Sequence, residues 1–141
     1  MTYKYLEHEA DIGIMATGAT IEEAFQDGAK AMFNVMFDTT LIEEKDEIPI
    51  YAEADDIAAL FVEVLNEMLF KQDTDAIAFS RFLVKEIKKE GDTYQLNGIA
   101  YGEPLNLQKH DVKTEVKAAT YSGLKFERED GNYVLQCVLD V

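Results

Sequence analysis

Apolar residues recur at helical spacing in two long segments of the chain. From Thr20 to about Met36, and again after Asp55 and Asp56, they fall at i, i+3, i+4, i+7 and i+8, which is typical of an amphipathic helix. Thr20 and Glu23 form a capping-box pair at the start of the first helix, and Asp55 or Asp56 is expected to cap the second. Both apolar stripes are expected to pack in the core.

Most of the remaining chain has strand character. Its runs are alternating, β-branched or aromatic, with turn residues at 90–92 and 130–131 that predict hairpins and a break at 102–104. Pro49 indicates an edge strand or the start of a strand. The expected strands cover residues 2–6, 12–16, 48–52, 79–87, 93–101, 112–126 and 133–139.

Two helices and hairpin-linked strands predict the fold class α+β. We expect a two-layer domain, with a mainly antiparallel mixed sheet and both amphipathic helices packed on one face of it. At 141 residues, the chain is long enough to bury a core and is expected to form one domain, residues 1–141.

The charge of the chain narrows the classes of partner. It contains 28 acidic and 13 basic residues, for a net charge of -15, whereas nucleic-acid binders neutralise phosphates with Lys and Arg. Tight direct binding of nucleic acid is therefore disfavoured, and cations or a basic protein surface are the expected partners. Solubility, or an organism that favours acidic proteins, is the alternative cause of the charge.

Membrane insertion and disulfide chemistry are not expected. No apolar run is long enough to cross a bilayer, and no secretory leader is visible. Cys137 is the only cysteine, so an internal disulfide is impossible and a reducing, cytoplasmic location is expected. The phase of its strand places Cys137 in the core rather than in a catalytic site.

Two acids at distant strand ends are the first candidates for chemistry. Asp11 directly precedes an alternating apolar run, and Asp140 stands next to last, after another such run. We expect these two ends to meet and form one acidic site. With the carboxylate of Val141, if the chain ends there, such oxygen donors suit a hard cation, Ca²⁺ or Mg²⁺. Two solvated acids at strand ends are the alternative.

Three further side chains are weighed in the same way. His8 could act as a general base near Asp11 or be a hydrogen-bonded structural histidine, and His110 is expected to be a surface or capping residue. Lys117 stands among small and apolar neighbours. It could organise carboxylates, or reach for a phosphate or a partner's acid, or simply be an exposed gatekeeper of an edge strand. Phosphate-binding loops, a dinucleotide fingerprint, a nucleophile elbow and EF-hand spacing are absent from the sequence.

Taken together, ordered segments along essentially the whole chain resemble the archease family. The segments that carry the resemblance are Tyr5-Leu6-Glu7-His8-Glu9-Ala10-Asp11-Ile12-Gly13-Ile14, Glu22-Glu23-Ala24-Phe25, Ala31-Met32-Phe33, Leu65-Asn66-Glu67-Met68-Leu69, Phe79-Ser80-Arg81-Phe82, Gly102-Glu103-Pro104, Glu115-Val116-Lys117-Ala118-Ala119-Thr120-Tyr121 and Leu139-Asp140-Val141. The chain departs from the family at Glu9, where the family's His-Thr-Ala-Asp stretch has a threonine. This departure adds a negative charge beside the acidic site.

The resemblance implies a non-catalytic activator or chaperone of the RtcB-type tRNA-splicing ligase. Archeases help this ligase to become guanylylated and to turn over many times in tRNA splicing and RNA ligation. The family's divalent-cation site, calcium by this resemblance, would map onto Asp11, Asp140 and Val141. Its required lysine would map onto Lys117, and His8 is the second candidate for acting on the partner.

Two other functions remain open from the sequence. The first is a small metal-dependent hydrolase that acts on phosphoesters with Asp11, Asp140, His8 and Lys117, although no nucleophile is evident. The second is a plain cation-binding or chaperone module for unrelated proteins. A holdase needs a large exposed apolar patch, whereas both helix stripes are expected to be buried in the core.

Overall fold

The computed structural model of the chain describes residues 2–8 and 11–141, without the side chains of Glu7 and His8. In chain order, the described elements are β1 (Thr2–His8), β2 (Asp11–Gly18), α1 (Ile21–Met36), the short 3₁₀ turn η1 (Thr39–Leu41), β3 (Asp46–Ala54), α2 (Ile57–Asp75), β4 (Ile77–Glu90), β5 (Thr93–Pro104), β6 (Ala118–Glu129) and β7 (Asn132–Asp140).

Both helices begin at side-chain caps. Thr20 Oγ1 accepts the N–H of Glu23 at 3.1 Å, and the Glu23 carboxylate accepts the N–H of Ala19 at 3.0 Å. Asp56 Oδ1 accepts the N–H of Ala59 at 2.7 Å. The bonds from Glu23 and Ala59 satisfy amide groups that the first turn of a helix leaves free, and the bond from Ala19 ties the residue before the cap to the helix. The capping-box prediction is confirmed, and Asp56 is the cap of α2.

The strands form two antiparallel sheets rather than the one sheet that we expected. A four-stranded sheet has the order β1-β2-β7-β6, and a three-stranded sheet has the order β3-β5-β4. The α+β class is confirmed, as is the edge position of the strand that contains Pro49. Alternation along a strand shows which face is buried, but it does not show which strands share a sheet.

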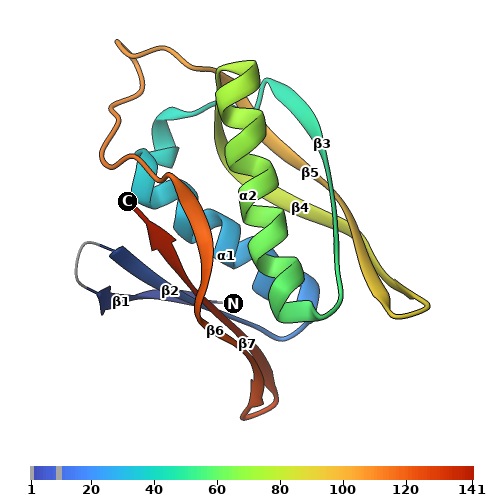
Figure 1. Cartoon of the computed structure of the whole chain (residues 1–141). Helices are drawn as coiled ribbons and strands as arrows, with labels where there is room; N and C mark the ends of the chain where they lie inside the picture. The colour runs from blue at the N-terminus through green and yellow to red at the C-terminus, as the bar shows by residue number, and fades with distance from the viewer. Residues whose placement is uncertain (1, 9–10) are drawn as a thin grey trace.

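Each helix packs against strands of both sheets. The helix α1 contacts β2 and β4, and α2 contacts β3 and β6, so the helices lie between the two sheets (Figure 1). The two helices approach closely at Gly28, where a Cβ atom would lie 2.5 Å from the ring of Phe61. Both helix stripes are buried, which confirms that they form the core. No helix in the described part of the chain is both long and apolar enough to cross a membrane.

The segment between β5 and β6 differs from the expected strand arrangement. The β5 strand continues through Pro104, opposite Ile77, instead of breaking at Gly102; at this last position the missing N–H of proline costs little. The strand predicted from Val112 begins only at Ala118, so that prediction is wrong for residues 112–117. These residues bond elsewhere: Val112 bridges to Phe37, and the N–H of Lys113 donates to the Met36 carbonyl at 2.8 Å.

Candidate functional site

One row of residues crosses the four-stranded sheet at one end. In strand register, His8 of β1 lies opposite Asp11 of β2, Asp11 lies opposite Asp140 of β7, and Asp140 lies opposite Ala118 of β6. Directly opposite residues share a face of the sheet, with their Cβ atoms about 5 Å apart. The expectation that the two distant acids meet is therefore confirmed. The side chain of His8 and all of Glu9 lie outside the described part of the structure.

Lys117 joins this row through its backbone. Its N–H donates to the carbonyl of Asp140 at 2.8 Å, and its side chain is exposed. The orange segment of Figure 1 descends past α1 to this point beside the end of β7. The fold thus brings Asp11, Asp140 and Lys117 together from three separate parts of the sequence.

A side chain of α2 holds the start of β6 next to Lys117. Asn66 Oδ1 accepts the N–H of Ala119 at 2.8 Å, and Asn66 Nδ2 donates to the carbonyl of Ala119 at 3.0 Å. Because β6 is an edge strand, one side of its backbone has no neighbouring strand to bond. Sequence reasoning assigned Asn66 no role. The signal in the sequence that could have indicated such a role is the side-chain amide of Asn66 beside an otherwise apolar helix stripe.

The acid and the lysine line two different hollows. Asp11 borders a hollow of about 740 Å³, together with Tyr3, Tyr5 and Asp38. Lys117 borders another of about 340 Å³, whose lining includes Gln72, Val112 and Glu115. Thr114 lines both hollows. A partner that reached Asp11 and Lys117 together would therefore contact both sides of the 112–117 segment.

The hollow beside Asp11 has well-anchored walls. The Tyr5 hydroxyl donates to the carbonyl of Ala31 at 3.0 Å, and burial raises the pKa of this tyrosine. Asn34 Nδ2 donates to the Tyr3 hydroxyl at 2.9 Å. Hydrogen bonds from Thr40 lower the pKa of the Asp38 carboxyl, so Asp38 stays ionised at the mouth of the hollow.

The donor atoms in this row suit a hard cation better than a soft one. Asp11 and Asp140 offer carboxylate oxygens on one face, and Ca²⁺ or Mg²⁺ completes its shell with carbonyl oxygens and water. Among the residues whose side chains the structure describes, no three His, Cys, Asp or Glu side chains gather as possible metal ligands. The side chain of Val141 packs against the core.

The single cysteine is excluded as a nucleophile. Cys137 is fully buried on the core side of β7, and burial raises the pKa of its thiol to about 12. Thiolate is the reactive form of cysteine, so the prediction of a core cysteine is confirmed.

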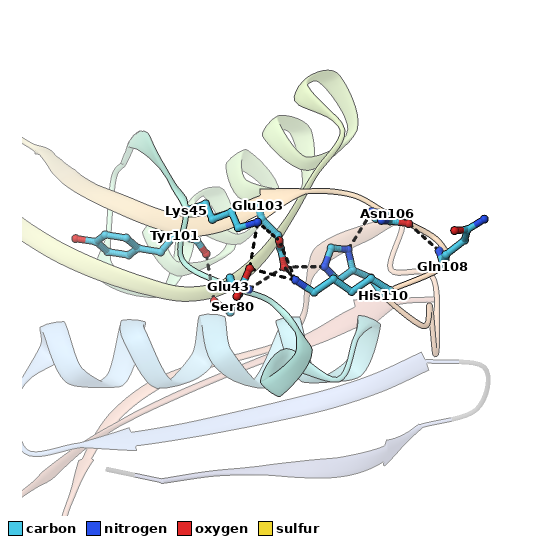
Figure 2. Close-up of polar contacts among 9 residues, drawn as sticks. Glu43, Lys45, Ser80, Tyr101, Glu103, Asn106, Gln108 and His110 are labelled. Atoms are coloured by element: carbon cyan, nitrogen blue, oxygen red, sulfur yellow. Dashed lines mark hydrogen bonds and ion pairs between the residues drawn. The ribbon is translucent and has the colours of Figure 1, made fainter.

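A second cluster, at the end of β5, contains a buried carboxylate. Glu103 Oε2 accepts the N–H of Glu43 at 2.8 Å and the ammonium of Lys109 at 2.9 Å, and it lies 2.9 Å from His110 Nε2 (Figure 2). The ammonium of Lys45 lies 3.6 Å from Oε1. Hydrogen bonds from the Glu43 amide, Lys109 and His110 lower the pKa of Glu103 to about 2.

His110 is buried, so the surface prediction for it is wrong. Its side chain has no exposed area, although its loop neighbours are exposed. Its Nδ1 accepts the N–H of Asn106 at 3.0 Å, which leaves Nε2 as the N–H that donates to Glu103 in the neutral ring. The ring thus closes the turn that begins at Asn106, and no helix is present in this described segment for it to cap. A polar loop gives no sign that one of its residues turns inward, because the carboxylate that attracts His110 comes from another element.

Comparison with known proteins identifies the family of the chain. The Archease protein family matches residues 3–141. "Protein archease" of Pyrococcus furiosus is 43% identical over 140 residues, covering 99% of this chain and 98% of the relative. "Protein archease" of Methanosarcina mazei is 38% identical over 139 residues, covering 99% and 95%. The relative of the same name from Methanopyrus kandleri is 38% identical over all 141 residues.

Two solved structures share the fold. The solution structure of protein 1598 of Methanobacterium thermoautotrophicum superposes with a TM-score of 0.87 at 36% identity, covering 99% of this chain and 98% of that one. The crystal structure of an archease described as a possible chaperone, from Thermotoga maritima, gives 0.56 at 23% identity, covering 98% and 96%, and it supports the fold alone. The resemblance seen in the sequence is thus confirmed, and the chain belongs to the archease family.

Proposed function

We propose that this protein is a non-catalytic activator of an RtcB-type RNA ligase, which promotes guanylylation of the ligase and repeated turnover in tRNA splicing and RNA ligation. The observation that carries the proposal is the convergence of Asp11, Asp140 and Lys117 across neighbouring strands. Membership of the archease family supports it.

The chemistry of the row supports an activator more than an enzyme. The carboxylates of Asp11 and Asp140 would hold a divalent cation, Ca²⁺ or Mg²⁺, which supplies positive charge for phosphate or carboxylate groups of the partner. Lys117, and His8 in the same row, are the candidates for acting on the ligase. The thiol is buried and protonated, so it offers no covalent route.

Activation of this kind is conformational. An activator accelerates a step that it does not perform by binding preferentially to the state in which that step can occur. The exposed Lys117 and the acidic row would stabilise the guanylylation-ready arrangement of the ligase pocket. With a net charge of -15, encounter with a basic surface is steered by opposite charge and weakens as salt rises.

A turnover assay tests the proposal. The protein alone, with RNA ends, GTP and divalent cation, should convert nothing. Added to an RtcB-type ligase, it should raise product per ligase well above one and speed formation of the ligase–GMP adduct. Ligase turnover that stays unchanged at a stoichiometric amount of the protein would refute the proposal.

Matched variants locate the activity. Lys117→Ala and Asp11→Asn should abolish most of the activation while the fold is kept, since surface substitutions change stability by only about 0.5 kcal/mol. Lys85→Ala, an exposed lysine of the other sheet, is the control and should activate normally. Intrinsic phosphodiesterase activity that disappears in Asp11→Asn would instead identify the metal-dependent hydrolase.

A further inference from the structure

The segment that delivers Lys117 to the acidic row has little regular structure of its own. Between the end of β5 at Pro104 and the start of β6 at Ala118, it contains a turn near Asn106 and the single bridge at Val112. We call residues 105–117 the strap. Most of its side chains are exposed. Val116 is buried in the core and Leu105 packs against that core, while the residues between these two anchors are positioned mainly by a few hydrogen bonds.

The strap is fixed at its first turn by a buried polar contact. His110 is 1% exposed and Glu103 is 4% exposed. His110 closes the turn by accepting the N–H of Asn106 through Nδ1, and it donates to Glu103 through Nε2. The backbone N–H of His110 also donates to the Asn106 carbonyl at 2.7 Å. One ring therefore joins the strap turn to the end of the three-stranded sheet.

The carboxylate of Glu103 is itself held from several directions. Its partners come from the segment before β3 and from the strap, namely the N–H of Glu43, the ammonium of Lys109 and the ring of His110. A buried carboxylate that loses one of these donors becomes costly. Lys45 and Lys109 are both directed at Glu43 and Glu103, so the neighbouring hollow is not a free anion site.

We propose that Glu103 and His110 are positioning residues for Lys117: they hold the strap so that Lys117 stays bonded beside Asp140. Lys117 follows His110 by seven positions and is fixed at the far end by its N–H bond to the Asp140 carbonyl. The contact thus connects the three-stranded sheet, through the strap, to the row of acids on the four-stranded sheet. The part of this inference that concerns ligase activation rests on the proposed function.

Amide hydrogen exchange tests the positioning role without the ligase. His110→Phe keeps an aromatic ring, slightly larger than imidazole, and removes both polar contacts, and it should speed exchange of the Lys113 and Lys117 amides about tenfold through local opening. Exchange at Ile14 and Cys137, in the β2–β7 pair, should stay unchanged. His110→Gln retains an N–H donor near the position of Nε2 and should restore part of the protection. Gln108→Ala, exposed in the same turn, is the control.

The outcomes separate positioning from general stability. Unchanged exchange at Lys117 in His110→Phe overturns the proposal, and so does an equal rise at Lys117 and Cys137, which indicates only global destabilisation. Should His110→Phe fail to fold, Glu103→Gln, which preserves size and an acceptor oxygen, must show the same local rise for the proposal to stand. Across these variants, activation of the ligase should decrease in the same order as the protection of the Lys117 amide from exchange. If the wild-type protein does not activate the ligase, the proposed function fails, while the exchange data still decide the role of the contact.

Discussion

Removal of the Asn66 side chain should destabilise the fold and loosen the strand that follows Lys117. In Asn66→Ala, the N–H and the carbonyl of Ala119 both lose their partner, and Ala119 is only 4% exposed. An unsatisfied buried polar group costs about 1–3 kcal/mol. Because Asn66 itself is half-buried and water can enter its place, we expect a total loss of about 2–3 kcal/mol, a large share of an ordinary stability of about 5–15 kcal/mol.

Urea unfolding measures this loss directly. The midpoint should fall with an unchanged slope, and the melting temperature should drop by roughly 4–12 °C, at about 2–4 °C per kcal/mol for a chain of this size. Asn66→Asp keeps an acceptor for the Ala119 N–H but turns a carboxylate toward the Ala119 carbonyl. Its deficit should shrink as the pH falls toward about 4, where the acid is protonated and can donate again.

The same experiments contain the result that would refute the reasoning. Glu67→Ala, the next residue of α2, should change stability by less than about 0.5 kcal/mol. If Asn66→Ala is no more costly than this control, the two bonds to Ala119 contribute nothing. Faster amide exchange at Ala119 and Lys117 should accompany the loss of stability, and exchange that is unchanged there would show that Asn66 does not hold the start of β6.

Three further predictions concern packing, cation binding and pH. Gly102→Ala should cost about 3 kcal/mol in urea unfolding, because a Cβ atom would lie 2.0 Å from the carbonyl oxygen of Ala78 on the neighbouring strand. Calcium at 100 times its dissociation constant should raise the free energy of unfolding by about 2.7 kcal/mol, and Asp11→Asn should remove most of this gain in a thermal-shift titration. Glu103 has its pKa lowered from 4.5 to about 2, so its contribution to stability is complete above pH 4.5 and is lost as the pH falls toward 2. Unfolding curves of Glu103→Gln across this window should show a weaker acid dependence than those of the wild type.

The sequence by itself determined the local structure of this protein. Helical spacing and the Thr20 cap placed α1, and the change to strand spacing placed the hairpins, because both signals come from residues that are close in the chain. Strand phase also placed Cys137 in the core. Their places at strand ends, together with the family resemblance, paired Asp11 with Asp140, although 129 positions separate them in the sequence.

Only the tertiary structure decided which strands form a sheet together and which polar groups of different elements bond to one another. The strands divide between two sheets, and each helix packs against strands of both sheets. Alternation along a single strand does not encode this division. His110 turns inward because the carboxylate of Glu103 arrives from another element. Residues 112–117 leave the expected strand where their backbone bonds to the end of α1. Asn66 matters because an edge strand presents free backbone groups to it. Each of these contacts joins residues whose distance in space is set by packing, so no local pattern could predict it.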